Sequence, residues 1–339
     1  VMPVMPGQKK VRPQVQAVNA LGYSADAVSS DAANVRGKAS SRYRNVQVLE
    51  FSDFHGAVED QGPSIGAALL ASAFERDRVA VPATVVVSAG DQFGASPVLS
   101  AQFDELPTVE SLNLMGLDVA TTGNHEHDKA LTHLRSMIGA SDFSWVVSNY
   151  STLKPLNFGE SKVDPFTIVD AGGIKVGVVG MNTEETADVT QAGNLNFGRD
   201  GAQTIVITPS VRPVNRAAAA ARAAGADVVV AALHEGWNAN VGGQPTGRLV
   251  DVTRELQGVD LAFGGHTHQT FASVVDGVPV AQTRNAGVEY TRTQACLDTK
   301  TGKVVGAAVE FVTEEDLAGL TPNRRVARLI DDYKQASKQ

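Results

Sequence analysis

Short apolar runs alternate with helix-like stretches along the chain from residue 45 onward. The runs are rich in Val, Ile, Leu and Phe and cover residues 46–51, 83–90, 143–149, 165–170, 174–180, 226–233, 259–265 and 278–283. Helical periodicity predicts helices within 64–77, 108–116, 129–139 and 209–225. Continuous apolar runs are typical of strands covered on both faces, so this alternation favours an α/β fold. Two further runs, 290–298 and 303–312, meet across Thr301-Gly302 and predict an antiparallel pair, which makes the sheet mixed.

The chain divides into three parts. Residues 1–44 mix Ala, Ser, Val and basic residues without sustained periodicity, and we interpret them as an extension that drapes over the rest and carries little chemistry. Residues 45–320 contain the apolar runs and predict one large domain. Residues 321–339 have Pro near their start and predict a closing helix or a connector to a further domain. The apolar face of that helix consists of Val326, Leu329, Ile330 and Tyr333.

Composition narrows the class of protein. The 339 residues are 43% hydrophobic and carry a formal net charge of -8, whereas binding of duplex nucleic acid needs a basic face. No apolar run approaches the roughly 18 residues that span a bilayer. The single cysteine, Cys296, excludes an internal disulfide and a zinc-thiolate cluster, and we interpret it as a half-buried structural thiol. Asn149-Tyr150-Ser151 fits a glycosylation pattern but ends a strand-like run, so it carries little weight.

Five of the strand-like segments end in residues that can bind metal ions. These residues are Asp53 and His55 after 46–51, Asp91 after 83–90, Asn124, His125 and Asp128 after 117–123, His234 after 226–233, and His266 and His268 after 259–265. Ligands of open α/β sheets bind beyond the carboxyl ends of strands, so the five segments are expected to meet in one crevice. Six of the 7 histidines lie in them; His133, in a predicted helix, is interpreted as a partly exposed helix residue.

Singly, each of these residues has an ordinary alternative role, such as a turn cap for Asp53 or a hydrogen-bonded core histidine for His234. Together they predict a metal site, and their number favours two ions, because a single four-coordinate site usually has three protein ligands and an open position. Two divalent ions about 3.5–4 Å apart, bridged by a carboxylate, bring four positive charges. Asp53, Asp91 and a bridging hydroxide would offset three of these charges, which leaves about one positive charge to attract a phosphate. Mixed imidazole, carboxylate and amide ligands suit Zn or Mn, and also Fe or Co.

In this order, the segments resemble the calcineurin-like metallophosphoesterases, and most closely the catalytic domain of the 5'-nucleotidase and UDP-sugar hydrolase family. The matching segments are FSDFHG, SAGDQFGASP, ESLNLMGLDVATTGNHEHD, IKVGVVGMNTEET, VVVAALHEG and VDLAFGGHTHQ. GNHE and GGHTH in register with the others make the resemblance specific. It implies a four-layer α/β/β/α sandwich of two mixed sheets flanked by helices, formed by residues 45–320 as the metallophosphoesterase catalytic domain.

The resemblance also implies a role for each residue. One ion would be held by Asp53, His55, Asp91 and His268, and the other by Asp91, Asn124, His234 and His266. His125, beside Asn124 at the substrate phosphate, matches the histidine that stabilises the phosphoryl transition state, and Asp128 matches its paired carboxylate.

Two neighbours of this histidine need separate interpretation. His127 stands where the family commonly has an aromatic residue, and we favour a tolerated surface histidine over a group that supports the site or faces the substrate. Glu126 is interpreted as a structural acceptor of backbone hydrogen bonds at the turn.

The function implied by the resemblance is metal-dependent hydrolysis of a small phosphate ester, with a nucleotide split into nucleoside and phosphate as the leading case. The alternatives are a phosphodiesterase or UDP-sugar pyrophosphatase on the same metal centre. A metal-bearing binding module whose catalysis has lapsed is disfavoured because His125 and Asp128 are both present. A Rossmann dehydrogenase is excluded because no G-x-G-x-x-G follows a strand.

The nucleotidase branch usually continues into a second domain that clamps the nucleobase, so residues 321–339 are a candidate linker to such a domain. The first residue is Val rather than Met. Together with the habit of the family, this predicts an extracytoplasmic location, meaning secreted, periplasmic or at the cell surface.

Overall fold

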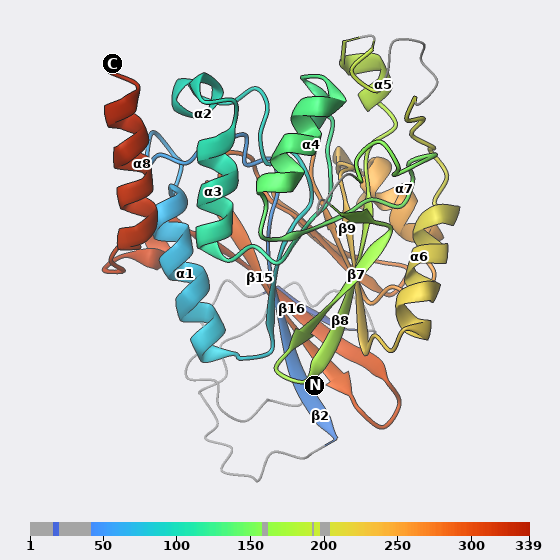
Figure 1. Ribbon diagram of the computed structural model, residues 1–339. Helices are drawn as coiled ribbons and strands as arrows, with labels where there is room; N and C mark the ends of the chain where they lie inside the picture. The colour runs from blue at the N-terminus through green and yellow to red at the C-terminus, as the bar shows by residue number, and fades with distance from the viewer. Residues whose placement is uncertain (1–15, 20–41, 158–161, 192, 197–203) are drawn as a thin grey trace.

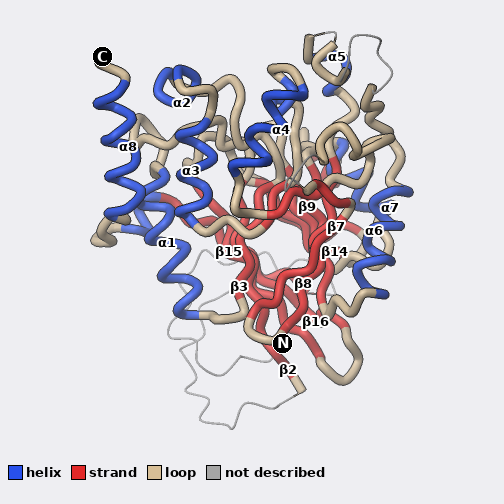
Figure 2. The backbone as a smooth tube through the Cα atoms, viewed as in Figure 1, coloured by secondary structure: helices blue, strands red, loops and turns tan. Residues whose placement is uncertain are grey.

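Two mixed β-sheets pack face to face in the computed structural model, and helices cover the outer face of each (Figure 1). The structure describes residues 16–19, 42–157, 162–191, 193–196 and 204–339. In Figure 2 the strands form the centre of the molecule, with helices on both sides. The predicted four-layer α/β/β/α sandwich is confirmed.

The first sheet has eight strands. Their order is β1 (Gln16–Asn19), β16 (Lys303–Thr313), β15 (Glu289–Asp298), β2 (Tyr43–Phe51), β3 (Thr84–Ser88), β4 (Val119–Ala120), β5 (Ser144–Val146) and β6 (Val163–Asp164). The strands from β2 to β6 run parallel, whereas β1, β16 and β15 add antiparallel pairs at one side. The predicted pairing of residues 290–298 with 303–312 is confirmed by β15 and β16. Part of the N-terminal extension also joins this sheet, because Gln16 pairs with Val309; residues 1–15 and 20–41 lie outside the described residues.

The second sheet has six strands. Their order is β13 (Phe271–Val275), β14 (Val278–Gln282), β12 (Leu261–Gly264), β9 (Val228–Leu233), β8 (Ile174–Met181) and β7 (Phe166–Ala171). The four inner strands run parallel, and the two outer ones are antiparallel to their neighbours. A separate two-stranded hairpin consists of β10 (Ala239–Val241) and β11 (Gln244–Thr246).

The alternation of side chains along each strand explains the layers. On β9, Val228 and Val230 face the other sheet, whereas Val229 and Leu233 pack against helices. On β2, Val48 faces the second sheet, whereas Leu49 and Phe51 pack against helices of the first layer. Because both faces of these strands are buried, their sequences are continuous apolar runs.

Helices on the two outer faces close the sandwich. The first sheet is covered by α1 (Ala67–Ala80), α3 (Leu106–Met115), α4 (Leu131–Ala140) and α8 (Arg324–Ala336), and the second by α6 (Arg212–Ala223) and α7 (Arg248–Glu255) (Figure 1). Shorter helical segments are α2 (Val98–Gln102), α5 (Thr186–Val189) and two 3₁₀ turns, His125–His127 and Glu314–Leu317. None of the helices in the described part of the chain combines the length and apolar character that crossing a membrane requires.

The C-terminal helix α8 packs on the first layer as its periodicity predicted. Val326 and Ile330 are buried in the same core cluster as α1 and α3, and Tyr333 packs against it. Asn323 caps the helix by accepting hydrogen bonds from the backbone N–H groups of Arg325 and Val326. Residues 321–339 therefore close this layer, and the boundaries at 44 and 320 and a linker role stay predictions.

Candidate metal centre

The five predicted segments meet at one edge of the sandwich. Three of them follow β2, β3 and β4 of the first sheet, and the other two follow β9 and β12 of the second. Each segment leaves the carboxyl end of a strand that runs parallel to a neighbour, which is where ligands of α/β sheets bind. The predicted convergence of the side chains on one place is therefore observed, and their contacts divide them into two groups.

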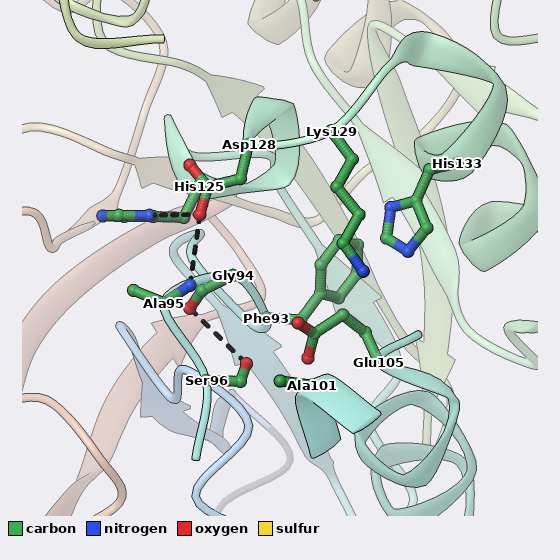
Figure 3. A pocket seen from close by; sticks show the side chains of 10 residues that line it. All are labelled: Phe93, Gly94, Ala95, Ser96, Ala101, Glu105, His125, Asp128, Lys129 and His133. Atoms are coloured by element: carbon green, nitrogen blue, oxygen red, sulfur yellow. Dashed lines mark hydrogen bonds and ion pairs between the residues drawn. The ribbon is translucent and has the colours of Figure 1, made fainter. Parts of the chain in front are cut away.

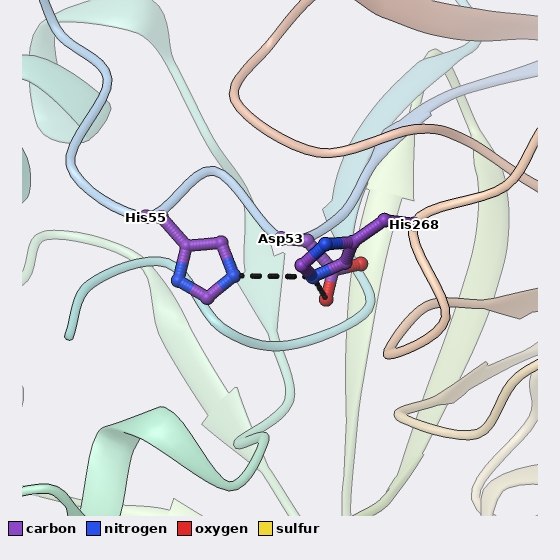
Figure 4. A group of neighbouring side chains, drawn as sticks. All are labelled: Asp53, His55 and His268. Carbon is purple, nitrogen blue, oxygen red and sulfur yellow. Dashed lines mark hydrogen bonds and ion pairs between the residues drawn. The ribbon is translucent and has the colours of Figure 1, made fainter. Parts of the chain in front are cut away.

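The first group is Asp53, His55 and His268 (Figure 4). His268 Nε2 lies 3.3 Å from Asp53 Oδ1 and 3.3 Å from His55 Nε2. Asp53 is fully buried and His55 nearly so, whereas His268 is exposed to solvent. One nitrogen or oxygen from each of the three residues lies within 4.8 Å of the others, a spacing that could hold a metal ion.

The second group is Asn124, His234 and His266. Asn124 Oδ1 lies 3.1 Å from His234 Nε2 and 3.0 Å from His266 Nδ1. His234 is fully buried, and a carboxylate oxygen of Asp91 lies 3.1 Å from its Nε2.

Asp91 lies between the two groups. Besides its contact with His234, its Oδ2 is 3.9 Å from His55 Nε2, and its Oδ1 accepts a hydrogen bond from the His125 backbone N–H. Possible metal clusters also link Asp91 with Asp53 and His234, and with His55 and His125. Asp91 is thus the carboxylate that faces both groups, as the prediction of a bridge requires.

The donor set fits cations because hydrogen-bond acceptors face one another. His55 Nδ1 donates to Gly94 O and His234 Nδ1 donates to Ala89 O, so each ring presents a lone pair on Nε2 to the cluster. That lone pair of His234 meets only acceptors, the oxygens of Asp91 and Asn124. Positive charge must therefore lie between these atoms, supplied either by a second proton on His234 Nε2 or by a metal ion.

The pKa shifts within the cluster also show that the carboxylates and His234 act on one another. Burial lowers the pKa of His234, but the carboxylates of Asp91 and Asp53 outweigh burial and raise it to about 10. Burial raises the pKa of Asp91, but His234 and His55 reverse this effect and hold it well below its ordinary value. The carboxylates of Asp91 and Asp53 are therefore ionised, and the His234 ring carries a second proton in the absence of another cation. Metal binding would displace that proton.

Backbone strain is concentrated in the same loops. Five predicted ligands have positive φ angles although none is glycine: Asp53 (51°), His55 (47°), Asp91 (52°), His266 (73°) and His268 (55°). Residues other than glycine rarely adopt this conformation, which costs of order 1–3 kcal/mol and clusters at functional sites. The strained positions therefore coincide with the loops that carry the predicted ligands.

Two glycines give His234 the room it needs. A Cβ atom at Gly90 would lie 2.4 Å from His234 Nδ1, and a Cβ atom at Gly123 would lie 2.6 Å from His234 Nε2 and 2.2 Å from Asp91 Oδ1. Any larger residue at either position would push the ring away from Asp91 and Asn124.

His125 and Asp128 form a pair beside the two groups. His125 Nδ1 lies 2.8 Å from Asp128 Oδ2, which also accepts a hydrogen bond from the Ala95 backbone N–H (Figure 3). The hydrogen bond that His125 donates to Asp128 raises the pKa of His125 to about 9, against the opposing effect of partial burial. The His125 ring packs edge-on against His55 with 4.8 Å between centroids, so its free Nε2 belongs to the same site.

A cavity of about 270 Å³ adjoins this pair (Figure 3). His125 and Asp128 form part of its wall, and Phe93, Glu105 and His133 line the rest together with neighbouring loop residues. His133 lies on α4 and is partly exposed as predicted, and its position in this wall was not anticipated.

The match to known families agrees with this geometry. A family model described as calcineurin-like phosphoesterase matches residues 46–270. The chain belongs to the calcineurin-like phosphoesterase family.

Two curated relatives and one crystal structure illustrate the likeness. Cell wall protein Lmo0130 of Listeria monocytogenes is 26% identical over 335 residues, which cover 85% of this chain and 41% of that protein. Endonuclease YhcR of Bacillus subtilis is 23% identical over 333 residues, covering 92% of this chain and 27% of that protein. The 5'-nucleotidase precursor from Thermus thermophilus has the same fold, with a TM-score of 0.70 at 21% identity, covering 87% of this chain and 59% of that chain. The chain spans less than two thirds of each of these proteins.

This calcineurin-like phosphoesterase chain departs from our prediction at His127, which is not a surface residue. Its side chain is fully buried, and Nε2 lies 2.5 Å from the Tyr150 hydroxyl. Asn149 is also buried and donates to Asn182 O and Thr208 O, so the weak glycosylation pattern falls on a core amide. The prediction for His127 was wrong because its contact with Tyr150 is not visible in the sequence.

Glu126 has the structural role that we predicted. Its buried carboxylate accepts hydrogen bonds from the backbone N–H groups of Gly123, Asp91 and Gln92. It therefore ties the loop after β3 to the loop after β4, and with it the positions of Asp91 and Asn124.

Glu185 is a residue of the phosphoesterase site that sequence analysis missed. Its Oε2 lies 3.0 Å from His266 Nε2, while His266 Nδ1 faces Asn124. The signal was present, because Glu185 follows the carboxyl end of β8 in the segment MNTEET, at the same sheet edge as the other loops.

Proposed function

We infer that this chain hydrolyses phosphate esters with two divalent metal ions, and that its leading substrate class is nucleotides, which it would convert to nucleoside and phosphate. The single observation that carries the inference is the set of acceptor atoms at the sheet edge, where buried Asp91 faces both side-chain groups. A 5'-nucleotidase precursor among the proteins of the same fold supports the choice of substrate.

The proposed ligands follow the two groups of contacts. Asp53, His55 and His268 would hold one ion and Asn124, His234 and His266 the other, with Asp91 bridging both. The ligand types suit Zn or Mn, and also Fe or Co. When bound, the ions supply positive charge that attracts the phosphate and activates a water molecule for attack on phosphorus.

His125 and Asp128 would act on the other side of the phosphate. Asp128 accepts from Nδ1 and fixes the ring, so the proton on Nε2 is available for a phosphoryl oxygen or for the departing oxygen. Asn124, next in sequence to His125, would contact the phosphate as well as an ion. The cavity beyond the pair offers room for the alcohol part of the substrate. No protein nucleophile is required by this scheme.

A phosphodiesterase on the same centre is the second candidate. This candidate is supported by the relative named endonuclease, whose match covers 92% of this chain. The formal net charge of -8 argues against duplex nucleic acid as its substrate. A UDP-sugar pyrophosphatase would use the same residues. An extracytoplasmic location is proposed too, supported by the relative named cell wall protein.

A substrate panel tests these proposals. Metal-free protein would be assayed with added Mn²⁺ or Zn²⁺ on p-nitrophenyl phosphate, a nucleoside monophosphate, bis-p-nitrophenyl phosphate and UDP-glucose. Monoester cleavage that a chelator abolishes is the expected result. Cleavage of the diester or UDP-glucose alone would select the second candidate, and bound metal without hydrolysis of any substrate would favour the lapsed binding module.

A further inference from the structure

Tyr150 is the centre of a buried polar network that the proposed mechanism does not use. Its hydroxyl lies 2.8 Å from Thr122 Oγ1, 2.5 Å from His127 Nε2 and 2.7 Å from Asn182 Nδ2. All four side chains are buried. A phenol has one proton to donate and two lone pairs, so these three partners use its entire hydrogen-bonding capacity.

The partners come from both sheets. Thr122 follows β4 of the first sheet, and Asn182 follows β8 of the second. Asn182 is itself held by Asn149, because the Asn182 backbone N–H donates to Asn149 Oδ1 and Asn149 Nδ2 donates to Asn182 O, at 3.0 and 2.7 Å. The network therefore fixes one sheet edge against the other at the level of the site.

The same network holds the turn that carries the proposed phosphate-binding residues. Thr122 precedes Asn124, His127 follows His125, and Asn182 Nδ2 also donates to Gly123 O at 3.0 Å. Hydrogen bonds thus hold the turn on both sides of Asn124 and His125. Glu126 holds it at other atoms, through the backbone N–H of Gly123 and the loop after β3.

We propose that Tyr150 is a positioning residue, which through Thr122, His127 and Asn182 sets the places of Asn124 and His125. The proposal rests on the proposed function for its effect on turnover, but not for its effect on metal binding. Burial lowers the pKa of His127 to about 4, so the ring is neutral and can donate to the phenol or accept from it. His127 is therefore a matched partner of the phenol.

The principal variant is Tyr150→Phe, which keeps the ring and removes only the hydroxyl. Three buried polar groups lose their shared partner, and the turn is free to shift. We expect kcat at saturating Mn²⁺ to fall ~10-fold, and the Mn²⁺ concentration for half occupancy to rise ~10-fold, because outer contacts of metal sites have effects of this size. The KM should change less than kcat, since Phe93, Glu105 and His133 on the rest of the cavity wall are not among the residues that contact the Tyr150 hydroxyl.

Tyr290→Phe is the matched control. It removes a hydroxyl from another fully buried tyrosine, whose partner at 2.7 Å is Asp77 at the end of α1. It should lower the melting temperature and leave both kcat and Mn²⁺ binding within two-fold of wild type. Equal losses in Tyr290→Phe and Tyr150→Phe would overturn the proposal, because they would reflect general destabilisation.

Two more variants keep the test decisive. Thr122→Val removes one partner with little change of shape and should lower kcat and Mn²⁺ affinity several-fold even if Tyr150→Phe does not fold. In the double variant His127→Phe/Tyr150→Phe, the losses should be smaller than the product of the single losses, because the two residues act as a unit. Multiplicative losses, or wild-type Mn²⁺ binding in both Thr122→Val and Tyr150→Phe, would overturn the proposal. A wild-type protein that binds Mn²⁺ but hydrolyses no phosphate ester would instead refute the proposed function and leave the Mn²⁺ test valid.

Discussion

His234 Nε2 lies 3.1 Å from Asp91 Oδ2, and this contact joins the loop after β9 of the second sheet to the loop after β3 of the first. Both side chains are buried, and the Nδ1 proton of His234 is already donated to Ala89 O. Nε2 therefore faces the Asp91 carboxylate either with a second proton or across a bound cation, at the seam between the sheets. A cation at this seam would stabilise the ligand cluster and also the packing of one sheet edge on the other.

Replacing Asp91 by Asn tests the bridge. The change keeps the shape of the side chain but removes the negative charge that faces both groups. Loss of a residue that only contacts a metal ligand lowers metal affinity or activity by about 10–100-fold. Loss of a bridging ligand should therefore lower kcat/KM by at least ~100-fold. Bound metal, measured by elemental analysis after dialysis, should fall below two ions per chain. Asp142→Asn, at an exposed carboxylate, is the control, and full activity of Asp91→Asn would refute the proposed centre.

Replacing His125 by Gln separates catalysis from metal binding. Its ring is paired with Asp128, and it is not needed in either group of ligands. We expect kcat to fall by ~10²–10⁴-fold, the usual contribution of a positioned acid or base, with metal content unchanged. His133→Gln, elsewhere on the wall of the cavity proposed for the alcohol part of the substrate, should change KM at most and keep kcat. Loss of metal from His125→Gln would show that His125 is a ligand instead.

Glu185 offers a test of how His266 is oriented. Because Glu185 accepts from Nε2, His266 presents the lone pair of Nδ1 to Asn124 and the proposed ion. Glu185→Ala should weaken binding of one metal ion by ~10-fold, at the low end of such effects because Glu185 is exposed. Glu185→Gln should lose less, since its amide oxygen can still accept. Chelator competition measures the metal affinity of both variants, with Glu184→Ala as the neighbouring control. Equal metal affinity in wild type and all three variants would exclude a role of Glu185 in orienting His266.

The sheets were predictable because their strands are buried on both faces. Within the predicted run 226–233, residues 228–233 are all apolar and rich in Val, which favours a strand buried on both faces, and they form β9. Helix α7 was missed for a physical reason. Its eight residues include Val250, Val252 and Thr253, whose β-branched side chains disfavour helix, and it is held by burial against the second sheet.

The site was predictable where one rule applied to every segment. Metal-binding residues after strand ends identified the members of both groups, including Asn124 and His268, whereas their division between two ions came from the family resemblance. The same rule applied to β8 would have included Glu185. The same rule does not predict the role of His127. A polar residue in a polar segment is expected to be exposed, and only the structure shows its buried contact with Tyr150.

The burial of His127 makes a last prediction about pH. Its pKa is lowered to about 4 from an ordinary 6.5, because burial penalises the charged ring. The unfolded chain therefore binds a proton near pH 6.5 that the folded chain resists until about pH 4. Stability contributed by the neutral ring is complete above pH 6.5 and is lost as the pH falls to 4, by about 3 kcal/mol in total.

Replacing His127 by Phe should remove this part of the pH dependence. Urea unfolding of chelated wild type and His127→Phe would be compared at pH 7 and pH 4.5, so that bound metal does not contribute. Wild type should lose more free energy of unfolding than the variant between these two values, although both lose some as carboxylates protonate. Parallel losses would mean that the folded protein accepts a proton on His127 as readily as the unfolded chain does, which its contact with Tyr150 in a fully buried site argues against.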